Sequence, residues 1–147
     1  MSTQRVAFIG TGIMGGHMAL NLAARGFPVA AWNRTQAKAA AIPGVAVAAT
    51  PSAAVADADV TIVMLSTGDV VDAVLFEPDA TGRVPADSLK RGSILVVMSS
   101  IPVETCRAQA ARLAAKGVRT VDAPVSGGEV GAREATLAIL AGGDEAT

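Results

Sequence analysis

Arg5-Val-Ala-Phe-Ile-Gly-Thr-Gly-Ile-Met-Gly15 is the stretch that decides the fold of this chain. Its first part, residues 6–9, is a short apolar run rich in residues that favour β-strands. Glycines follow at positions 10, 12 and 15, and a pattern typical of a helix begins at about residue 13. A G-x-G-x-x-G spacing between a strand and a helix indicates binding of a dinucleotide.

Each glycine of this turn answers a different physical demand. Gly10 makes the tight turn, Gly12 lets the backbone approach a pyrophosphate, and Gly15 lets the helix pack closely on the strand. The first turn of the helix then offers unpaired N–H groups and a partial positive charge to phosphates. Ordinary turn glycines without a ligand are the alternative. The candidate coenzyme-binding residues here are Gly10, Thr11, Gly12, Ile13, Met14 and Gly15.

Strand-like and helix-like segments alternate along the rest of the chain. Strands are predicted at residues 6–9, 29–32, 45–47, 59–65, 93–97 and 119–122, with a further candidate at 136–141. Helices are predicted at residues 13–25, 35–41, 51–56, 70–76 and 103–116. This alternation predicts an α/β fold, a doubly wound (Rossmann-type) parallel sheet flanked by helices, in which residues 1–147 form a single dinucleotide-binding domain.

The composition suits such a sheet and argues against other classes of protein. Hydrophobic residues make up 51% of the 147 positions and aromatic residues only 3%, which favours an aliphatic core of buried parallel strands. The net charge of −1 provides no basic surface for nucleic acid. No uninterrupted apolar segment approaches the roughly 20 residues that span a bilayer. With one cysteine and one histidine, we expect no disulfide, no metal and a cytoplasmic protein.

The segments that follow the predicted strands form the candidate site. In a doubly wound sheet, ligands bind beyond the carboxyl ends of the strands, and these ends meet at one edge. The segments concerned are residues 10–15, 33–35, 65–67, 99–101 and 123–128. Beyond the glycine turn, the candidate coenzyme-binding residues among them are Asn33, Arg34, Thr35, Leu65, Ser66, Thr67 and Ser100.

The residues after the second strand indicate which nicotinamide coenzyme is preferred. A protein that binds NAD normally has Asp or Glu here, which accepts a hydrogen bond from the ribose 2′-hydroxyl. This chain has neutral Asn33, followed by Arg34, whose guanidinium can pair with a 2′-phosphate, and by Thr35. We therefore expect NADP in preference to NAD. The alternative is that Asn33 and Thr35 are only turn and cap residues, and that Arg34 is only solvated.

Two longer motifs resemble signatures of the β-hydroxyacid dehydrogenase family, of the 3-hydroxyisobutyrate dehydrogenase and 2-hydroxy-3-oxopropionate reductase type. Phe8-Ile-Gly-Thr-Gly-Ile-Met-Gly15, followed by Met18-Ala-Leu-Asn-Leu22, resembles its coenzyme signature. Asp122-Ala-Pro-Val-Ser-Gly-Gly-Glu-Val-Gly-Ala132, continued by Ala135-Thr-Leu137 and Gly142-Gly143, resembles its substrate signature. The resemblance covers essentially the whole chain but only the amino-terminal, NADP-binding half of a typical member. The family's α-helical carboxyl-terminal domain is therefore expected to be absent.

The resemblance implies hydride transfer between NADP(H) and a small β-hydroxyacid or its semialdehyde. It implies that the nicotinamide side of the coenzyme is lined by Met14, Leu65, Ser66 and Ser100. It also implies that Ser126, Gly127 and Gly128 hold the substrate's carboxylate, which fits the anion-binding capacity of consecutive N–H groups in a turn. A flexible turn is the alternative for Ser-Gly-Gly. Two other functions stay open: a non-catalytic module that senses NADP(H), and half of an imine-reductase-type enzyme, which shares the Trp-Asn-Arg-Thr type of strand end.

Departures from the family pattern concern catalysis. Val97 stands where an acidic residue is frequent, and Ala135 stands where glycine is usual. The family's catalytic lysine lies beyond the end of this chain, so no catalytic residue is assigned and the fragment alone is expected to be inactive. Lys38, Lys90 and Lys116 are poor substitutes, since the last two precede strands and should lie at the opposite edge of the sheet.

Three further expectations concern residues and surfaces outside these motifs. His17 is expected to be a solvated surface residue, and Cys106 a small buried packing residue. With a mean hydropathy of +0.46 and no helical domain to cover it, the chain is expected to expose aliphatic surface. We therefore expect a homo-oligomer or association with the missing helical domain, besides a small carboxylate or aldehyde substrate.

Overall fold

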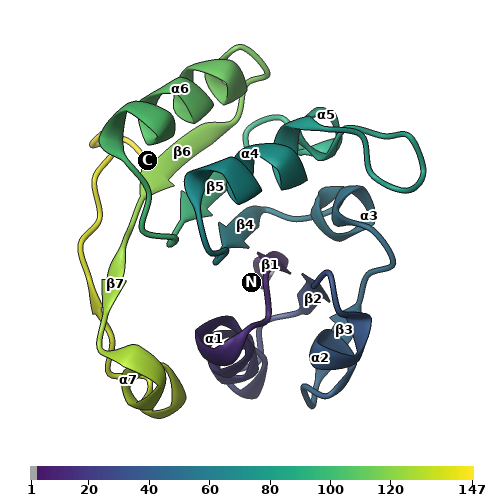
Figure 1. The fold of residues 1–147 in the computed structure, drawn as a ribbon, viewed down its shortest axis with the longest axis vertical. Coiled ribbons are helices and arrows are strands. Elements are labelled where there is room, and N and C mark those ends of the chain that lie inside the picture. Colours follow the sequence, from purple (N-terminus) through teal and green to yellow (C-terminus); the bar gives the residue numbers. More distant parts are fainter. Residues whose placement is uncertain (1–2) are drawn as a thin grey trace.

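The computed structural model describes residues 3–147 and contains a six-stranded parallel sheet with helices on both faces (Figure 1). The strands are β1 (Val6–Ile9), β2 (Val29–Trp32), β3 (Val45–Val47), β4 (Val60–Val63), β5 (Ile94–Val97) and β6 (Arg119–Asp122). The helices are α1 (Ile13–Ala24), α2 (Gln36–Ala40), α3 (Pro51–Val55), α4 (Gly68–Phe76), α5 (Pro85–Ser88), α6 (Val103–Ala114) and α7 (Gly128–Glu134). The strand order β3-β2-β1-β4-β5-β6 is that of doubly wound dinucleotide-binding folds. The predicted fold is therefore confirmed.

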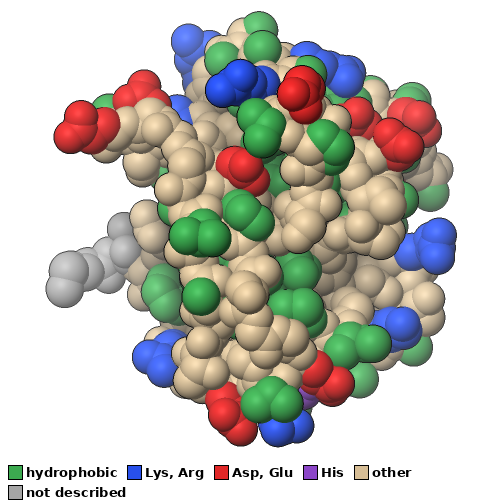
Figure 2. Space-filling view, turned by 60° about the vertical axis from the view of Figure 1, so that its left-hand side comes forward, with side chains coloured by type: hydrophobic (Ala, Val, Ile, Leu, Met, Phe, Trp, Pro, Cys, Tyr) green, Lys and Arg blue, Asp and Glu red, His purple; other side chains and the backbone are tan. Residues whose placement is uncertain are grey.

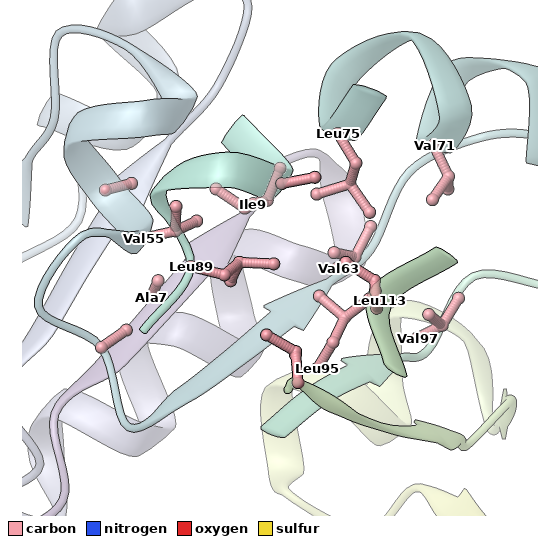
Figure 3. Packing of buried hydrophobic residues seen from close by; sticks show 14 residues of the cluster. Ala7, Ile9, Val55, Val63, Val71, Leu75, Leu89, Leu95, Val97 and Leu113 are labelled. Atoms are coloured by element: carbon pink, nitrogen blue, oxygen red, sulfur yellow. The ribbon is translucent and has the colours of Figure 1, made fainter. Parts of the chain in front are cut away.

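Two layers of helices cover the sheet. Helices α3 to α6 lie on one face, and α1, α2 and α7 lie on the other (Figure 1). Each face has its own apolar cluster, and Figure 3 shows the cluster beneath α3 to α6. The sheet is thus buried on both sides, as expected for parallel strands.

Strand β1 shows why the opening stretch has to be apolar throughout. Alternate side chains of a strand point to opposite faces, so Ala7 and Ile9 join one cluster while Val6 and Phe8 join the other. All four residues are at most 5% exposed. Full burial of a side chain such as Ile9 or Phe8 stabilises the fold by about 1.5–3 kcal/mol, so a polar residue at any of these positions would be costly.

The segment after β6 differs most from the sequence prediction. It contains α7, which was not predicted, inside a short antiparallel ribbon of β7 (Val125–Ser126) and β8 (Ala138–Ile139). The predicted strand at 136–141 therefore shrinks to the two residues of β8. Helix α7 has Gly128 and Gly131 among its seven residues, and glycine weakens the sequence signal for a helix. The short helix α5 was also not predicted.

Threonine side chains cap the first turns of two helices, α3 and α4. Helix α4 begins at Gly68, two residues before the predicted start, because Thr67 Oγ1 accepts a hydrogen bond from Val70 N at 3.2 Å. Helix α3 is capped by Thr50, whose Oγ1 accepts from Ala53 N at 3.1 Å. Thr35 occupies the cap position of α2 as predicted, but its side chain makes no capping hydrogen bond.

Candidate functional site

The carboxyl ends of five strands stop at one level of the sheet. Their last residues are paired across neighbouring strands in a single row, which runs Trp32, Ile9, Val63, Val97 and Asp122. The segments that follow these residues therefore leave the sheet along one edge, as the sequence predicted. Parallel strand ends that meet in this way form the ligand-binding edge of doubly wound folds.

The glycine turn (residues 10–15) places its three motif glycines in three different environments. Gly10 has a φ of +98°, and a Cβ at this position would overlap the carbonyl oxygen of Met64. A Cβ at Gly15 would overlap the carbonyl oxygen of Gly10. A Cβ at Gly12 would meet no atom within 4 Å. Gly10 and Gly15 are thus required by the fold itself, whereas Gly12 faces open space.

The start of α1 suits a phosphate group. Gly12 is its N-cap residue and supplies no side-chain capping bond, and the first turn contains no acidic residue. The first N–H groups of α1 therefore keep their capacity to bind an anion, with the favourable end of the helix dipole behind them. Next to them, the Thr11 hydroxyl is buried and has no hydrogen-bond partner within residues 3–147. These features fit a bound pyrophosphate.

Asn33 ties the end of β2 to the glycine turn. Its Oδ1 accepts a hydrogen bond from Thr11 N at 2.9 Å, and its Nδ2 donates to the carbonyl oxygen of Thr35 at 3.0 Å. Asn33 therefore acts as a turn residue, which was one of the two alternatives that the sequence left open. Arg34 and Thr35 are exposed, and within the described part of the chain Arg34 takes part in no ion pair. Arg34 thus offers an uncommitted positive charge beside the turn.

Ser99 lies in the predicted site segment 99–101, but its role there was not predicted. It is 1% exposed, and its Oγ accepts a hydrogen bond from Leu65 N at 2.8 Å and donates to Val63 O at 3.5 Å. Ser99 therefore fixes the chain where it leaves β4. The paired serines were a usable signal, because alternation along an extended segment turns one side chain inward and leaves the other, Ser100, exposed at the edge.

The Ser-Gly-Gly turn (residues 126–128) lies at the same side of the sheet, directly before α7. Gly127 has a φ of +139° and Gly128 a φ of +61°, a region that side chains other than glycine rarely adopt. All three residues are exposed. A Cβ at Gly128 would meet nothing within 4 Å. The turn therefore presents bare backbone to solvent, held between the ribbon and α7.

His17 is a surface residue, as the sequence predicted, but its side chain is only partly exposed. Its side chain is 29% exposed, and its Nε2 lies 3.4 Å from Glu129 Oε1 in α7. The short helix α7, absent from the prediction, is what covers it. Of the lysines, Lys90 Nζ donates to Asp59 Oδ1 at 2.6 Å and Lys116 pairs with Asp87. The hydrogen bond from Lys90 is the main reason why the pKa of Asp59 is lowered.

Cys106 and Val97 are both buried. Cys106 is buried, as predicted, and burial, with a smaller contribution from the Asp122 charge, raises the pKa of its thiol. A thiol held in its protonated form is a poor nucleophile. Val97 belongs to the cluster in Figure 3 and is fully buried, so an acidic residue at this position would lie in apolar surroundings. Over residues 3–147, His, Cys, Asp and Glu form no group suited to a metal ion.

No helix within residues 3–147 has both the length and the apolar character that crossing a membrane requires.

A model of the protein family described as "NAD binding domain of 6-phosphogluconate dehydrogenase" matches residues 5–147. Among curated relatives, the "Probable 3-hydroxyisobutyrate dehydrogenase" of Mycobacterium tuberculosis (strain ATCC 25618 / H37Rv) is 42% identical over 144 residues, which are 97% of this chain and 47% of the relative. The chain spans about half the length of the curated relatives it matches, and it corresponds to their amino-terminal half.

Solved structures of similar fold hold either coenzyme. The Mycobacterium tuberculosis 3-hydroxyisobutyrate dehydrogenase with L-serine has a TM-score of 0.89 at 36% identity, covering 99% of this chain and 48% of that one. Psf3 in complex with NADP+ and 2-OPP has a TM-score of 0.85 at 30% identity, covering 96% and 49%. An imine reductase variant from Myxococcus stipitatus with NAD+ has a TM-score of 0.85 at 23% identity, covering 99% and 48%, and shows the fold alone. These structures do not distinguish NADP from NAD for this chain.

Proposed function

Since the chain belongs to the family of the NAD binding domain of 6-phosphogluconate dehydrogenase, we propose that it is the NADP(H)-binding part of an oxidoreductase. The proposed reaction is hydride transfer between NADP(H) and a small β-hydroxyacid or its semialdehyde. Similarity to 3-hydroxyisobutyrate dehydrogenases supports the substrate class. The observation that carries the proposal is the glycine turn, with Gly12 facing open space at the edge where five strands end.

The coenzyme would be held by four of the segments at this edge. The glycine turn and the first turn of α1 would bind the pyrophosphate through N–H groups. The nicotinamide side would be lined by Met14, Leu65, Ser66 and Ser100. Ser99 would hold the backbone of Leu65 in place, because its Oγ accepts a hydrogen bond from Leu65 N. When bound, the nicotinamide supplies the hydride chemistry, and the protein supplies position and electrostatics.

The preference for NADP would come from Arg34. An exposed guanidinium with no carboxylate partner among residues 3–147 can form charge-assisted hydrogen bonds to a 2′-phosphate. Asn33 has a neutral amide, so it adds no negative charge that would repel the phosphate. Its amide also forms hydrogen bonds with the backbone. Thr35, exposed beside Arg34, would contribute a neutral hydroxyl.

The substrate's carboxylate would be held by the Ser-Gly-Gly turn. Two consecutive glycines in left-handed conformations expose backbone N–H groups, and such a concavity binds anions. A proton donor for the reaction is not assigned within the described residues, because Lys90 and Lys116 are paired before strands. We therefore propose that the 147-residue polypeptide binds coenzyme without appreciable turnover.

Titration of this polypeptide with NADPH and NADH tests the proposal. The expected result is tighter binding of NADPH. Arg34→Ala should weaken NADPH binding by about 10- to 100-fold, because hydrogen bonds to charged groups contribute about 1.5–3 kcal/mol, and should leave NADH binding nearly unchanged. Arg25→Ala is the matched control, since Arg25 is exposed at the far end of α1. Equal affinities for both coenzymes in the unmodified chain would contradict the NADP preference, and binding of neither would contradict the function.

A further inference from the structure

We infer that Asn21, in the middle of α1, is a positioning residue that holds the Ser-Gly-Gly turn in register with the glycine turn. This inference rests on the proposed function, because it assigns Asn21 to the substrate-anchoring role of residues 126–128. Asn21 belongs to none of the segments that follow strand ends, and its side chain contacts α7.

The contact itself is a hydrogen bond between two helices. Asn21 Nδ2 donates to the carbonyl oxygen of Ala132 at 2.7 Å, and it lies 3.4 Å from the carbonyl oxygen of Arg133. Both carbonyls belong to the last turn of α7, where backbone oxygens lack partners within their own helix. Ala132 is 1% exposed, and its hydrogen bond with Asn21 is partly buried. Asn21 thus caps α7 from outside.

Helix α7 needs support from outside the helix. It has seven residues, two of them glycine, and helices of this length are not stable in isolation. Its carboxyl-terminal cap, Ala135, has a φ of +57°, which costs energy for a residue with a Cβ. The helix begins at Gly128, within the Ser-Gly-Gly turn itself. Motion of α7 would therefore move the turn.

A second contact shows how α1 and α7 are aligned. His17 lies one helical turn before Asn21 in α1, and its partner Glu129 lies three residues before Ala132 in α7. The residue nearer the start of α1 contacts the residue nearer the start of α7, and the later residue of α1 contacts the later residue of α7. The two helices therefore run parallel, and both lie on the same side of the sheet (Figure 1). The His17–Glu129 pair is exposed and contributes less than a buried hydrogen bond. Of the two polar contacts between α1 and α7, the one made by Asn21 is therefore the stronger.

The position of Asn21 also makes the inference easy to test. Alanine is a better helix former than asparagine, so Asn21→Ala should not weaken α1 through helix propensity. Any loosening of α7 would then come from the lost donor. Asn21→Asp adds a second variant of nearly the same shape, in which a carboxylate faces the two carbonyl oxygens and repels them. The His17→Ala variant reports on the weaker contact.

The experiment uses the 15N-labelled 147-residue chain, saturated with NADP+, in NMR. Amide exchange is measured in α1 and α7, and the Gly127 and Gly128 amide shifts are followed during titration with 3-hydroxyisobutyrate. We expect faster exchange in α7 but not in α1 for both Asn21 variants. We also expect hydroxyacid binding about tenfold weaker, since a turn that is correctly placed for only a fraction of the time loses affinity by that fraction. The affinity for NADP+ should change by less than about twofold.

Three results would count against the inference, and they are distinguishable from one another. Unchanged α7 exchange in Asn21→Ala would show that the hydrogen bond does not hold the helix. Faster exchange with unchanged hydroxyacid affinity would show that Asn21 has a structural role only. If the unmodified chain binds NADP+ but its Gly127 and Gly128 amides do not respond to the hydroxyacid, the proposed substrate site is wrong and the inference falls with it.

Discussion

Asn33 illustrates how one residue connects turn geometry with coenzyme choice. Its two side-chain atoms are both engaged, Oδ1 by Thr11 N and Nδ2 by the Thr35 carbonyl oxygen. The sequence left a turn residue and a coenzyme-selecting residue as alternatives, but the geometry is compatible with both at once. A neutral amide can hold the glycine turn through hydrogen bonds and still place no negative charge beside Arg34.

Replacing Asn33 should separate these two roles. Asn33→Asp keeps an acceptor for Thr11 N but adds a negative charge beside Arg34, so NADPH affinity should fall by at least about tenfold while NADH affinity is retained. Asn33→Ala removes both hydrogen bonds and should weaken both coenzymes. Fluorescence titration measures each affinity. An Asp variant that loses NADPH and NADH equally would argue that the side chain acts only on the turn.

Ala135 should be improved by glycine. It is the only non-glycine residue with positive φ in the part of the chain that the structure describes, and this conformation costs a residue with a Cβ about 1 kcal/mol or more. Ala135→Gly should therefore raise the free energy of unfolding by about 1 kcal/mol, as measured in urea. Ala108→Gly, at an exposed position in the middle of α6, should lower it by a similar amount. A destabilised Ala135→Gly variant would show that the left-handed cap carries no strain.

At the scale of elements, the parallel sheet and the short helices α2 and α3 were predictable, whereas α5 and α7 were not. Strand β1 is buried on both faces of the sheet, so all of its residues are apolar, and this apolar run is visible in the sequence. The strand ends therefore converge as predicted, which brings the glycine turn, Arg34 and Ser100 to one edge. Helix α7 has no comparable pattern in its own sequence, because it is held by a contact with Asn21, which lies more than 100 residues away in the chain. The contact of His17 with Glu129 could not be predicted for the same reason, and the role of Ser99 could not be predicted because burial of its hydroxyl depends on two neighbouring strands.

The connection between α4 and α5 should make stability depend on pH. Asp79 accepts hydrogen bonds from Ser52 N at 3.2 Å and from Thr81 N at 2.9 Å, and the bonds from Ser52 and Thr81 hold the pKa of Asp79 below its usual value of 3.8. A lowered folded-state pKa stabilises the fold above the unfolded-state pKa, and this stabilisation is lost as the pH falls through the folded-state value. Wild type should therefore exceed Asp79→Asn in stability at neutral pH, with the difference shrinking below pH 3.8.

Urea unfolding at several pH values measures this difference. Asp57→Asn is a suitable control, because it makes the same change of charge at an exposed position in the loop after α3. A difference between wild type and Asp79→Asn that stays constant from neutral pH to below 3.8 would contradict the role assigned to the ionised carboxylate.

At the scale of the whole molecule, apolar side chains reach the surface around α7 and the ribbon. Leu140 is 74% exposed, Ile139 54% and Val130 53%. Figure 2 turns this side of the molecule forward and shows hydrophobic side chains across the middle of the face, with charged side chains mainly at its margins. Beside them, an apolar cavity of about 340 Å³ opens between α1, α7 and the sheet. Apolar surface of this kind favours association with another protein surface.

We expect the 147-residue chain to self-associate at micromolar concentration through this face. Leu140→Glu should shift the population toward monomer in sedimentation velocity, because it places a charge in the contact. Val47→Glu, at an exposed apolar position on the edge strand β3, should have no such effect. A concentration-independent monomer would contradict the expectation, and an equal response to both variants would place the contact elsewhere.

The common level at which five strands end also determines where this molecule can tolerate insertions. One residue added within a strand would displace its exit by about 3.3 Å and turn every following side chain to the opposite face. The same residue added beyond the row from Trp32 to Asp122 would lengthen a single loop and leave the other four exits where they are. Loop exchange between relatives should therefore succeed when each cut is made just past this row, and fail when it falls one residue inside it.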